Sequence, residues 1–311
     1  MSYHFRPGEP LAEGVRRVVR EEIQQAIAEI DDEALDRHEA VHQVRKRCKK
    51  IRATLRLVRP NMKKAYRNEN AFFRDAAKKL SALRDAQAQV ETFDLLMGED
   101  VGRAAQFAVI RNVLVAQRDA LAKEQGVLEA RLAEFRDDMC AALGRIAEWP
   151  VQGSGFAVIE AGLAKSYGRG RKALKNAYKE RTATAFHEWR KRVKYHWYHV
   201  RLLEGAWPAV CNALRDELKQ LSDYLGDDHD LAVLRGRVAE VPIDYGPTDT
   251  VEQFLELLDA RRMQFEMAAQ PLGWRVYAAK PKKMAAKWRV WWEAGVEEAR
   301  RAAGGQVRAE S

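Results

Sequence analysis

The stretch Val41–Pro60, VHQVRKRCKKIRATLRLVRP, decides how the whole sequence is interpreted. Its apolar residues recur at steps of three and four, which predicts a helix whose buried face contains Val41, Val44, Cys48, Ile51, Leu55 and Val58. A cationic stripe lies beside that face and contains His42, Arg45, Lys49, Arg52 and Arg56, with Lys46, Arg47 and Lys50 further round. No acidic residue interrupts this stripe in the sequence, although like charges at such spacings weaken a helix. We therefore expect the stripe to bind a polyanion.

The same pattern returns at Phe186–Gly205, FHEWRKRVKYHWYHVRLLEG, at a constant separation of 145 positions. The second cationic stripe contains His187, Arg190, Lys194 and Arg201, with Lys191 next to it. The second apolar stripe contains Phe186, Trp189, Val193, Val200 and Leu203. Without a gap, the same offset places Leu80, Arg84 and Asp85 over Leu225, His229 and Asp230. This repeat predicts an all-α, internally duplicated helical bundle with two similar four-helix-type halves related by pseudo-twofold symmetry.

Turn-forming residues mark the boundary between the two copies at positions 149–156, WPVQGSGF. The expected halves are therefore residues 1–150 and 151–311. Pro60 is expected to end the first basic helix, because proline restricts the residue before it. Other helices are expected over Leu11–Ile30, Phe72–Met97, Arg103–Trp149 with a break near Gly126, Val251–Met267 and Lys283–Arg301. The last eight residues, GGQVRAES, are expected to form a frayed tail.

Composition is that of a folded protein, with 47% hydrophobic and 32% charged residues among 311. The net charge of +9 is concentrated in the two basic helices, which favours a local anion site. The first residues, MSYHFRPGEP, contain no apolar core, and the sequence has no run of 18 apolar residues, so we expect a cytoplasmic protein without a membrane span. Its three cysteines share no C-x-x-C spacing, which argues against a disulfide framework and a zinc cluster.

Three groups of residues resemble metal sites, but none is expected to hold a metal. The literal H-E-x-x-H at His38–His42 matches zinc proteases, yet only His42 recurs in the second copy, and cations follow it. Asp227, Asp228 and Asp230 could bind Mg²⁺ for phosphoester hydrolysis. In the first copy only Asp85 matches this cluster, so Asp85 and Asp230 are expected to face neighbouring basic side chains instead. His196 and His199 are expected to pack between helices.

At the two basic helices the sequence resembles the CHAD family, the conserved-histidine α-helical domain. Its motif H-x-x-R-x-x-x-K-x-x-R is matched by His42, Arg45, Lys49 and Arg52, and again by His187, Arg190 and Lys194, with Trp197 in the last arginine position. The runs YGRGRKALKNAYKE, Tyr167–Glu180, and LGDDHDLAVL, Leu225–Leu234, are also typical of the family. The resemblance implies a duplicated helical bundle that binds inorganic polyphosphate in a basic groove or pore and has no known chemistry of its own.

The expected function is therefore non-enzymatic binding of inorganic polyphosphate, without a cofactor, by a protein that can associate with polyphosphate granules. The expected ligand-binding residues are His42, Arg45, Lys46, Lys49, Arg52, Arg56, Arg169, Arg171, Lys172, His187, Arg190, Lys191, Lys194 and Arg201. The two cationic stripes are expected to face one shared cleft. Two alternatives stay open: a nucleic-acid-binding protein, for which only Trp197 offers an aromatic platform on the stripes, and a metal-dependent polyphosphate-processing enzyme.

Overall fold

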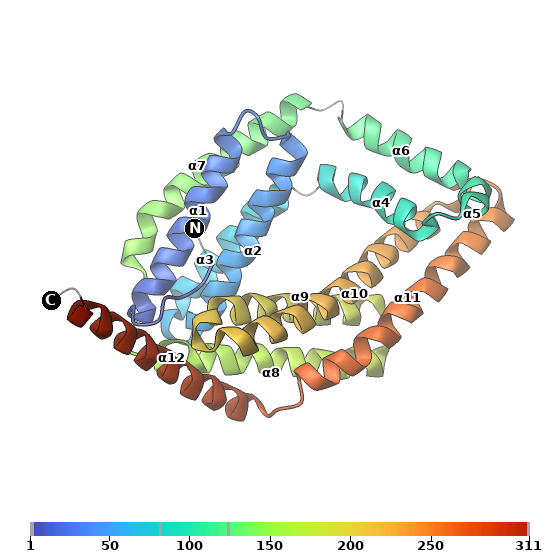
Figure 1. Cartoon of the computed structure of the whole chain (residues 1–311). Helices are drawn as coiled ribbons and strands as arrows, with labels where there is room; N and C mark the ends of the chain where they lie inside the picture. The colour runs from blue at the N-terminus through green and yellow to red at the C-terminus, as the bar shows by residue number, and fades with distance from the viewer. Residues whose placement is uncertain (1–2, 81, 123–124, 310–311) are drawn as a thin grey trace.

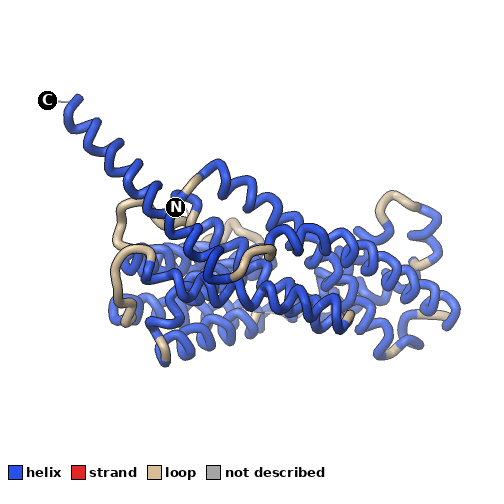
Figure 2. Tube along the Cα trace, turned by 90° about the horizontal axis from the view of Figure 1, so that it is seen from below, coloured by secondary structure: helices blue, strands red, loops and turns tan. Residues whose placement is uncertain are grey.

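The computed structural model describes residues 3–80, 82–122 and 125–309. Figure 2 shows helices joined by loops throughout this part of the chain, with no strand, so the predicted all-α fold is confirmed. The twelve α-helices within the described ranges are α1 (Leu11–Asp31), α2 (Arg37–Met62), α3 (Lys64–Lys79), α4 (Ala82–Met97), α5 (Val101–Gln106), α6 (Ala108–Ala122), α7 (Gln125–Arg145), α8 (Ala157–Glu180), α9 (Ala183–Leu202), α10 (Pro208–Glu240), α11 (Thr248–Val276) and α12 (Pro281–Ala309). None of the helices searched within these ranges is long and apolar enough to cross a membrane.

The first basic stretch forms α2, which begins at a side-chain cap. The carboxylate of Asp36 accepts hydrogen bonds from the backbone N–H groups of His38 and Glu39 at 2.9 and 3.0 Å. Such caps satisfy donors that the first helical turn leaves free. The expectation that Pro60 ends the helix is wrong, because Pro60 lies inside the last turn and α2 continues to Met62. The chain turns at Lys63, whose φ of 45° lies in the left-handed region.

A close backbone contact fixes α8 against the C-terminal part of α2. A Cβ atom placed on Gly162 of α8 would lie 1.8 Å from the carbonyl oxygen of Leu57 and 2.8 Å from that of Arg56. Glycine therefore lets the two helices approach more closely here than any larger residue would. This contact places the basic side chains near the end of α2 next to those of α8.

Two clusters of buried apolar side chains hold the helices together. The first core is formed by α1–α3, α7–α9, the first half of α10, the end of α11 and α12. The second core consists of Val90, Phe93, Met97, Phe107, Ile110, Leu114, Leu231, Leu234, Val238, Tyr245, Val251, Phe254 and Leu258. Figure 1 shows α4–α6 beside the ends of α10 and α11 that lie away from α1. Each core combines residues from before and after position 150. Within the described residues, therefore, neither predicted half has a core of its own.

The order of helices follows the predicted repeat with one difference. The offset of 145 positions places α9 over α2, and the single helix α10 over both α3 and α4. A single helical region was expected over Phe72–Met97, but α3 ends at Lys79 and α4 begins at Ala82. The chain turns there because α3 packs against α2 and α7, whereas α4 packs against α6 and α10. The twofold relation between the halves stays a prediction.

Two further boundaries differ from the sequence-based expectation. The break was expected near Gly126, but this residue lies within α7, which begins at Gln125; α6 ends at Ala122, and residues 123–124 lie outside the described residues. The C-terminal segment was expected to fray from Gly304 onward, but the backbone is helical to Ala309. In Figure 2 this last part of α12 extends away from the other helices.

Candidate polyanion-binding site

The two cationic stripes meet where α2 passes α9. The neutral ring of His199, fully buried, contacts the carbonyl oxygen of Ala53 through Nε2 at 2.9 Å and joins the two helices. Burial first, then the charges of Arg190, Arg45 and Lys194, lowers the pKa of Lys49 to about 8. Cations from both copies are therefore close enough to repel one another. We call Arg45, Lys49, Arg190 and Lys194 the central cluster.

The side chain of Lys49 reaches solvent although neighbouring groups of the protein lie close to it. Its side chain is exposed to solvent, yet burial is the largest cause of its lowered pKa. A side chain can be exposed to solvent and still have its pKa lowered by burial when protein surrounds it on several sides without covering it. The pKa of Lys194 is lowered in the same way, by burial and by Arg190. Asp230 opposes these shifts at both lysines, as expected for an acid that faces basic side chains. The side chain of its counterpart Asp85 lies outside the described residues.

No carboxylate of the described residues forms an ion pair within 4 Å of the central cluster, and Asp230 only partly opposes the mutual repulsion of its cations. The opposite side of α2 gives a contrast. There the Lys50 ammonium lies 2.8 Å from Glu22 of α1, and the Arg47 guanidinium contacts Glu22 at 3.0 Å and Glu29 at 2.6 Å. Glu22 and Lys50 are 5% and 6% exposed, so this network is structural. The fold thus pairs Arg47 and Lys50 of α2, which face α1, with carboxylates of that helix.

Two histidines from different helices are packed together beside the central cluster. The ring centroids of His187 in α9 and His229 in α10 are 4.0 Å apart. Burial and then His187, Arg190, Lys191 and Lys49 lower the pKa of His229 to about 3. Burial and the adjacent cations also lower the pKa of His187. Both rings are therefore neutral at pH 7 in the free protein. Nδ1 of His187 is buried and has no hydrogen-bond partner in the described structure.

Arg52 and Arg56 continue the stripe along α2, but their roles differ from that of Lys49. The Arg56 guanidinium is 8% exposed and donates to the hydroxyls of Tyr66 and Tyr195 at 2.5 and 2.9 Å. It also donates to Oδ1 of Asn70 at 3.1 Å, and Arg52 donates to the same oxygen at 3.3 Å. These partners are uncharged and occupy both Nη groups of Arg56, whereas its buried Nε has no hydrogen-bond partner in the described structure. Arg56 therefore adds positive potential and holds α2, α3 and α9 together.

Other expected ligand-binding residues have contacts of their own. The Arg201 guanidinium lies 5.0 Å from the ring centroid of Trp197, and the Lys194 ammonium lies 5.2 Å from it. Trp197 thus sits between two cations of its stripe. Lys191 pairs with Glu188, and Arg45 donates to the carbonyl oxygen of Ala77 at 3.2 Å.

Three more of the expected residues are placed by local geometry. Arg171 donates from Nε to the carbonyl oxygen of Tyr277 at 3.2 Å, so its guanidinium turns toward the end of α11. Lys46 contacts the side-chain oxygen of Gln43 at 3.4 Å, and His42 is exposed on α2. Among the expected residues, these three are not placed in the central cluster by any described contact.

Arg169 and Lys172 are exposed on α8 and line surface hollows at its two sides. One hollow, of about 280 Å³, lies between α8 and α9 and also contains Arg192, Glu180 and Glu188. The other lies between the end of α2 and α8 and contains Arg59 and Lys63, which were missed as site residues. The signal was present, since both residues continue the three-and-four spacing of the cationic stripe beyond Arg56.

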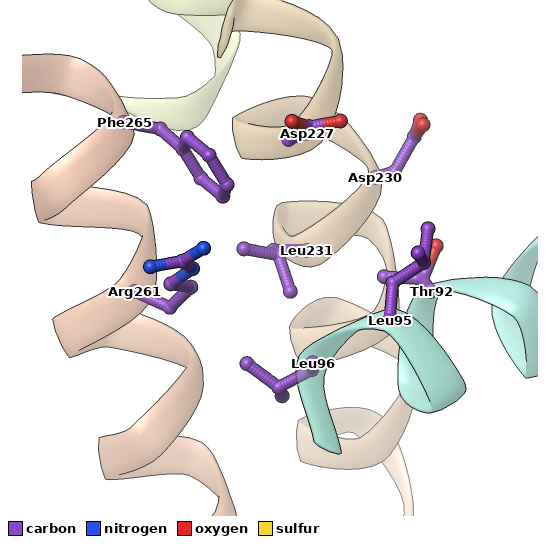
Figure 3. A pocket seen from close by; sticks show the side chains of 8 residues that line it. All are labelled: Thr92, Leu95, Leu96, Asp227, Asp230, Leu231, Arg261 and Phe265. Atoms are coloured by element: carbon purple, nitrogen blue, oxygen red, sulfur yellow. The ribbon is translucent and has the colours of Figure 1, made fainter. Parts of the chain in front are cut away.

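The acidic residues of α10 are arranged around a different hollow. Figure 3 shows Asp227 and Asp230 at one side of a space of about 260 Å³ whose other walls are Thr92, Leu95, Leu96, Leu231, Arg261 and Phe265. Asp228 is 1% exposed and accepts a hydrogen bond from Nε of Arg262 at 3.0 Å. In the described ranges no three His, Cys, Asp or Glu side chains are placed to share a metal ion.

Comparison with known proteins gives one match. A family model described as CHAD domain matches residues 17–239, which begins within α1 and ends in the last turn of α10. A search of curated proteins returned no match. The matched segment includes both cationic stripes and the central cluster, whereas α11 and α12 lie beyond it.

Proposed function

The chain belongs to the CHAD domain family, and we propose from this that it binds inorganic polyphosphate at the central cluster without catalysing a reaction on it. The observation that supports this proposal most is the meeting of cations from two helices that lie 145 positions apart in the sequence. Placing Lys49, Arg190 and Lys194 together costs free energy in the empty protein, because like charges repel. A bound polyanion offsets that cost.

Polyphosphate fits the types of side chain in the cluster. Arginine presents a planar fork of N–H donors that matches the oxygens of a phosphate, and lysine supplies a compact charge with three donors. The neutral His187 ring can donate a further hydrogen bond to a phosphate oxygen. A chain of identical phosphates needs no side chain that distinguishes one unit from the next.

The contacts of Trp197 favour polyphosphate over nucleic acid. Proteins that bind single-stranded nucleic acid stack bases on exposed aromatic rings. Trp197 is the aromatic residue of the second cationic stripe, and its ring already contacts two cations, Lys194 and Arg201. This ring therefore spaces and orients charges.

Binding rather than catalysis is supported by the neighbours of the α10 carboxylates. Asp228 is engaged by Arg262, and Asp230 faces the ammonium groups of Lys49 and Lys194. These carboxylates already have cationic partners, whereas a metal-dependent phosphotransfer site needs them for the metal.

The test is a competition experiment. The protein should bind long-chain polyphosphate in the presence of excess DNA or RNA, and log affinity should fall linearly with log salt concentration. The double variant K49Q/R190Q should weaken binding at least about tenfold, since each of the two substitutions removes a charged hydrogen bond to the ligand. The control R103Q/R118Q removes the same charge from an exposed site on α5 and a partly exposed site on α6 and should bind like wild type. Displacement of polyphosphate by nucleic acid at equal phosphate concentration would instead assign the site to nucleic acid.

Absence of catalysis is tested separately. Incubation with polyphosphate and Mg²⁺ should leave the chain length unchanged on gels. Sustained phosphate release that disappears in Asp230→Ala but persists in Arg45→Ala would contradict the proposal and assign hydrolysis to the acidic residues.

The proposal also gives a location in the cell. A protein that binds long polyphosphate should collect on cytoplasmic polyphosphate granules. A fluorescent fusion of the wild type should form foci that coincide with stained granules, and K49Q/R190Q should be diffuse. Foci of equal intensity in this variant would mean that recruitment does not use the central cluster.

A further inference from the structure

A second basic surface lies at the end of α2, in the hollow where this helix meets α8. The hollow has a volume of about 470 Å³ and is lined by Arg59, Lys63, Tyr66, Arg67, Lys165 and Arg169. We call it the α2–α8 hollow. Five of its six lining residues are cations and none is a carboxylate. None of the five cations forms an ion pair with an acid of the described residues.

Arg59 is the residue whose surroundings most require a ligand. Its Nε and Nη2 atoms are buried and have no hydrogen-bond partner within the described structure. Its guanidinium lies 5.7 Å from the ring centroid of Tyr66. Burial and then the charge of Arg169 lower its pKa. Leaving buried N–H donors of a charged group unpaired costs free energy that a hydrogen-bonding anion recovers.

The buried acid–base network of α1 and α2 gives a contrast to this arrangement. Where Lys50 is buried at the other side of α2, Glu22 lies 2.8 Å from its ammonium. At Arg59 the neighbouring charge is instead a second guanidinium, that of Arg169. The cations that approach each other here are therefore available to an anion from solution.

The hollow continues the line of the central cluster along α2. Lys49, Arg52, Arg56 and Arg59 follow one another at steps of three and four, which places them on one face of the helix, and Lys63 follows directly after its last residue. Ten residues separate Lys49 from Arg59, which corresponds to about 15 Å along the helix axis. Arg52 and Arg56 lie between them and keep the intervening surface positive.

We propose that the α2–α8 hollow is a second phosphate-binding subsite, which holds a distant part of the same polyphosphate chain that occupies the central cluster. This inference rests on the proposed function. It adds a requirement for length, because only a chain that spans both subsites gains the high effective concentration of the second contact. Tripolyphosphate is too short to span about 15 Å and binds one subsite at a time.

The experiment compares tripolyphosphate with long-chain polyphosphate by calorimetry at fixed ionic strength. In the double variant R59Q/R169Q, long-chain affinity should fall about tenfold or more, because the second contact is lost. Tripolyphosphate affinity at the central cluster should stay within about twofold of wild type. A second variant, R67Q/K165Q, changes two exposed side chains and should reduce long-chain affinity in the same direction without affecting folding. R103Q/R118Q controls for the loss of two positive charges.

The outcomes separate this inference from the proposed function. Suppose that wild type binds long-chain polyphosphate, that K49Q/R190Q binds it more weakly, and that both hollow variants bind it like wild type. The second subsite then does not exist, and binding at the central cluster remains. If wild type binds no polyphosphate of any length, the proposed function fails and the subsite fails with it. The inference also predicts that K49Q/R190Q retains a phosphate-dependent shift of the Arg59 Nε–H signal in nuclear magnetic resonance spectra. If K49Q/R190Q loses that shift while the wild-type protein still binds polyphosphate, the α2–α8 hollow is not a subsite that binds phosphate independently of the central cluster.

Discussion

Protonation of Lys49 should set the upper pH limit of polyphosphate binding. Burial and the charges of Arg190, Arg45 and Lys194 lower its pKa from 10.5 to about 8, so in the free protein the neutral form predominates above that pH. A bound polyanion favours the charged ammonium, and binding above pH 8 must therefore take up a proton. At pH 9 about one-tenth of the free protein carries the charge, so affinity should be about tenfold lower than at pH 7.

Calorimetry in buffers of different ionisation enthalpy measures this proton directly. At pH 8.5 the wild type should take up about three-quarters of a proton per bound site, and Lys49→Arg should remove most of the uptake because guanidinium stays charged. The variant should also lose most of the decline in affinity between pH 7 and 9. Lys283→Arg, at an exposed position on α12, is the matched control. The reasoning is refuted if wild-type affinity is constant over this range, or if Lys49→Arg declines as steeply.

Three further predictions follow from individual contacts. Affinity should rise as pH falls from 7 to 5, because the polyanion favours the charged form of His187, whose pKa is lowered in the free protein; titrations of His187→Gln should lack this rise. Glu22→Gln should lower the free energy of unfolding in urea by about 3 kcal/mol or more, since it leaves the buried Lys50 ammonium without its carboxylate; a loss below about 1 kcal/mol would contradict a buried charge pair. Gly162→Ala should lower the melting temperature, because its methyl would meet the Leu57 carbonyl oxygen and overpacking costs about 1–3 kcal/mol; an unchanged melting temperature would mean that α8 shifts freely.

The helices and the convergence of the stripes could be predicted because both depend on local periodicity and repetition. Spacings of three and four place Val44 and Ile51 in the core and Lys49 beside them whatever the neighbouring helices are. A repeated cationic stripe in turn indicates one ligand for both copies. The meeting of Lys49 with Arg190 and Lys194 agrees with that reasoning.

The partners of individual cations could not be predicted, because they depend on which helix packs on each side. Arg47 and Lys50 belong to the same basic run as Lys49, and only the position of α1 brings Glu22 to them. Arg171 likewise turns to a carbonyl oxygen at the end of α11, which periodicity within α8 cannot indicate.

The α2–α8 hollow was missed for a different reason. Its residues on α2 continue the spacing of the stripe, but a proline inside the last turn was interpreted as the end of the helix. Proline removes one backbone donor and need not end a helix within its final turn. The interruption between α3 and α4 had no comparable signal, because it reflects a change of packing partners.

The second core has a consequence for how the polypeptide is made. Its apolar residues on α4 leave the ribosome long before those on α10 and α11, because Met97 and Leu231 are far apart in the chain. At about 5–20 residues per second, the nascent chain waits roughly 7 to 27 seconds for Leu231 after Met97 is made. During that interval α4 and α6 present an uncovered apolar face to water, and aggregation competes with folding. Translation of this protein should therefore depend on chaperones that shield nascent helices, and pauses between α6 and α10 should lower the yield of folded protein more than pauses after α11.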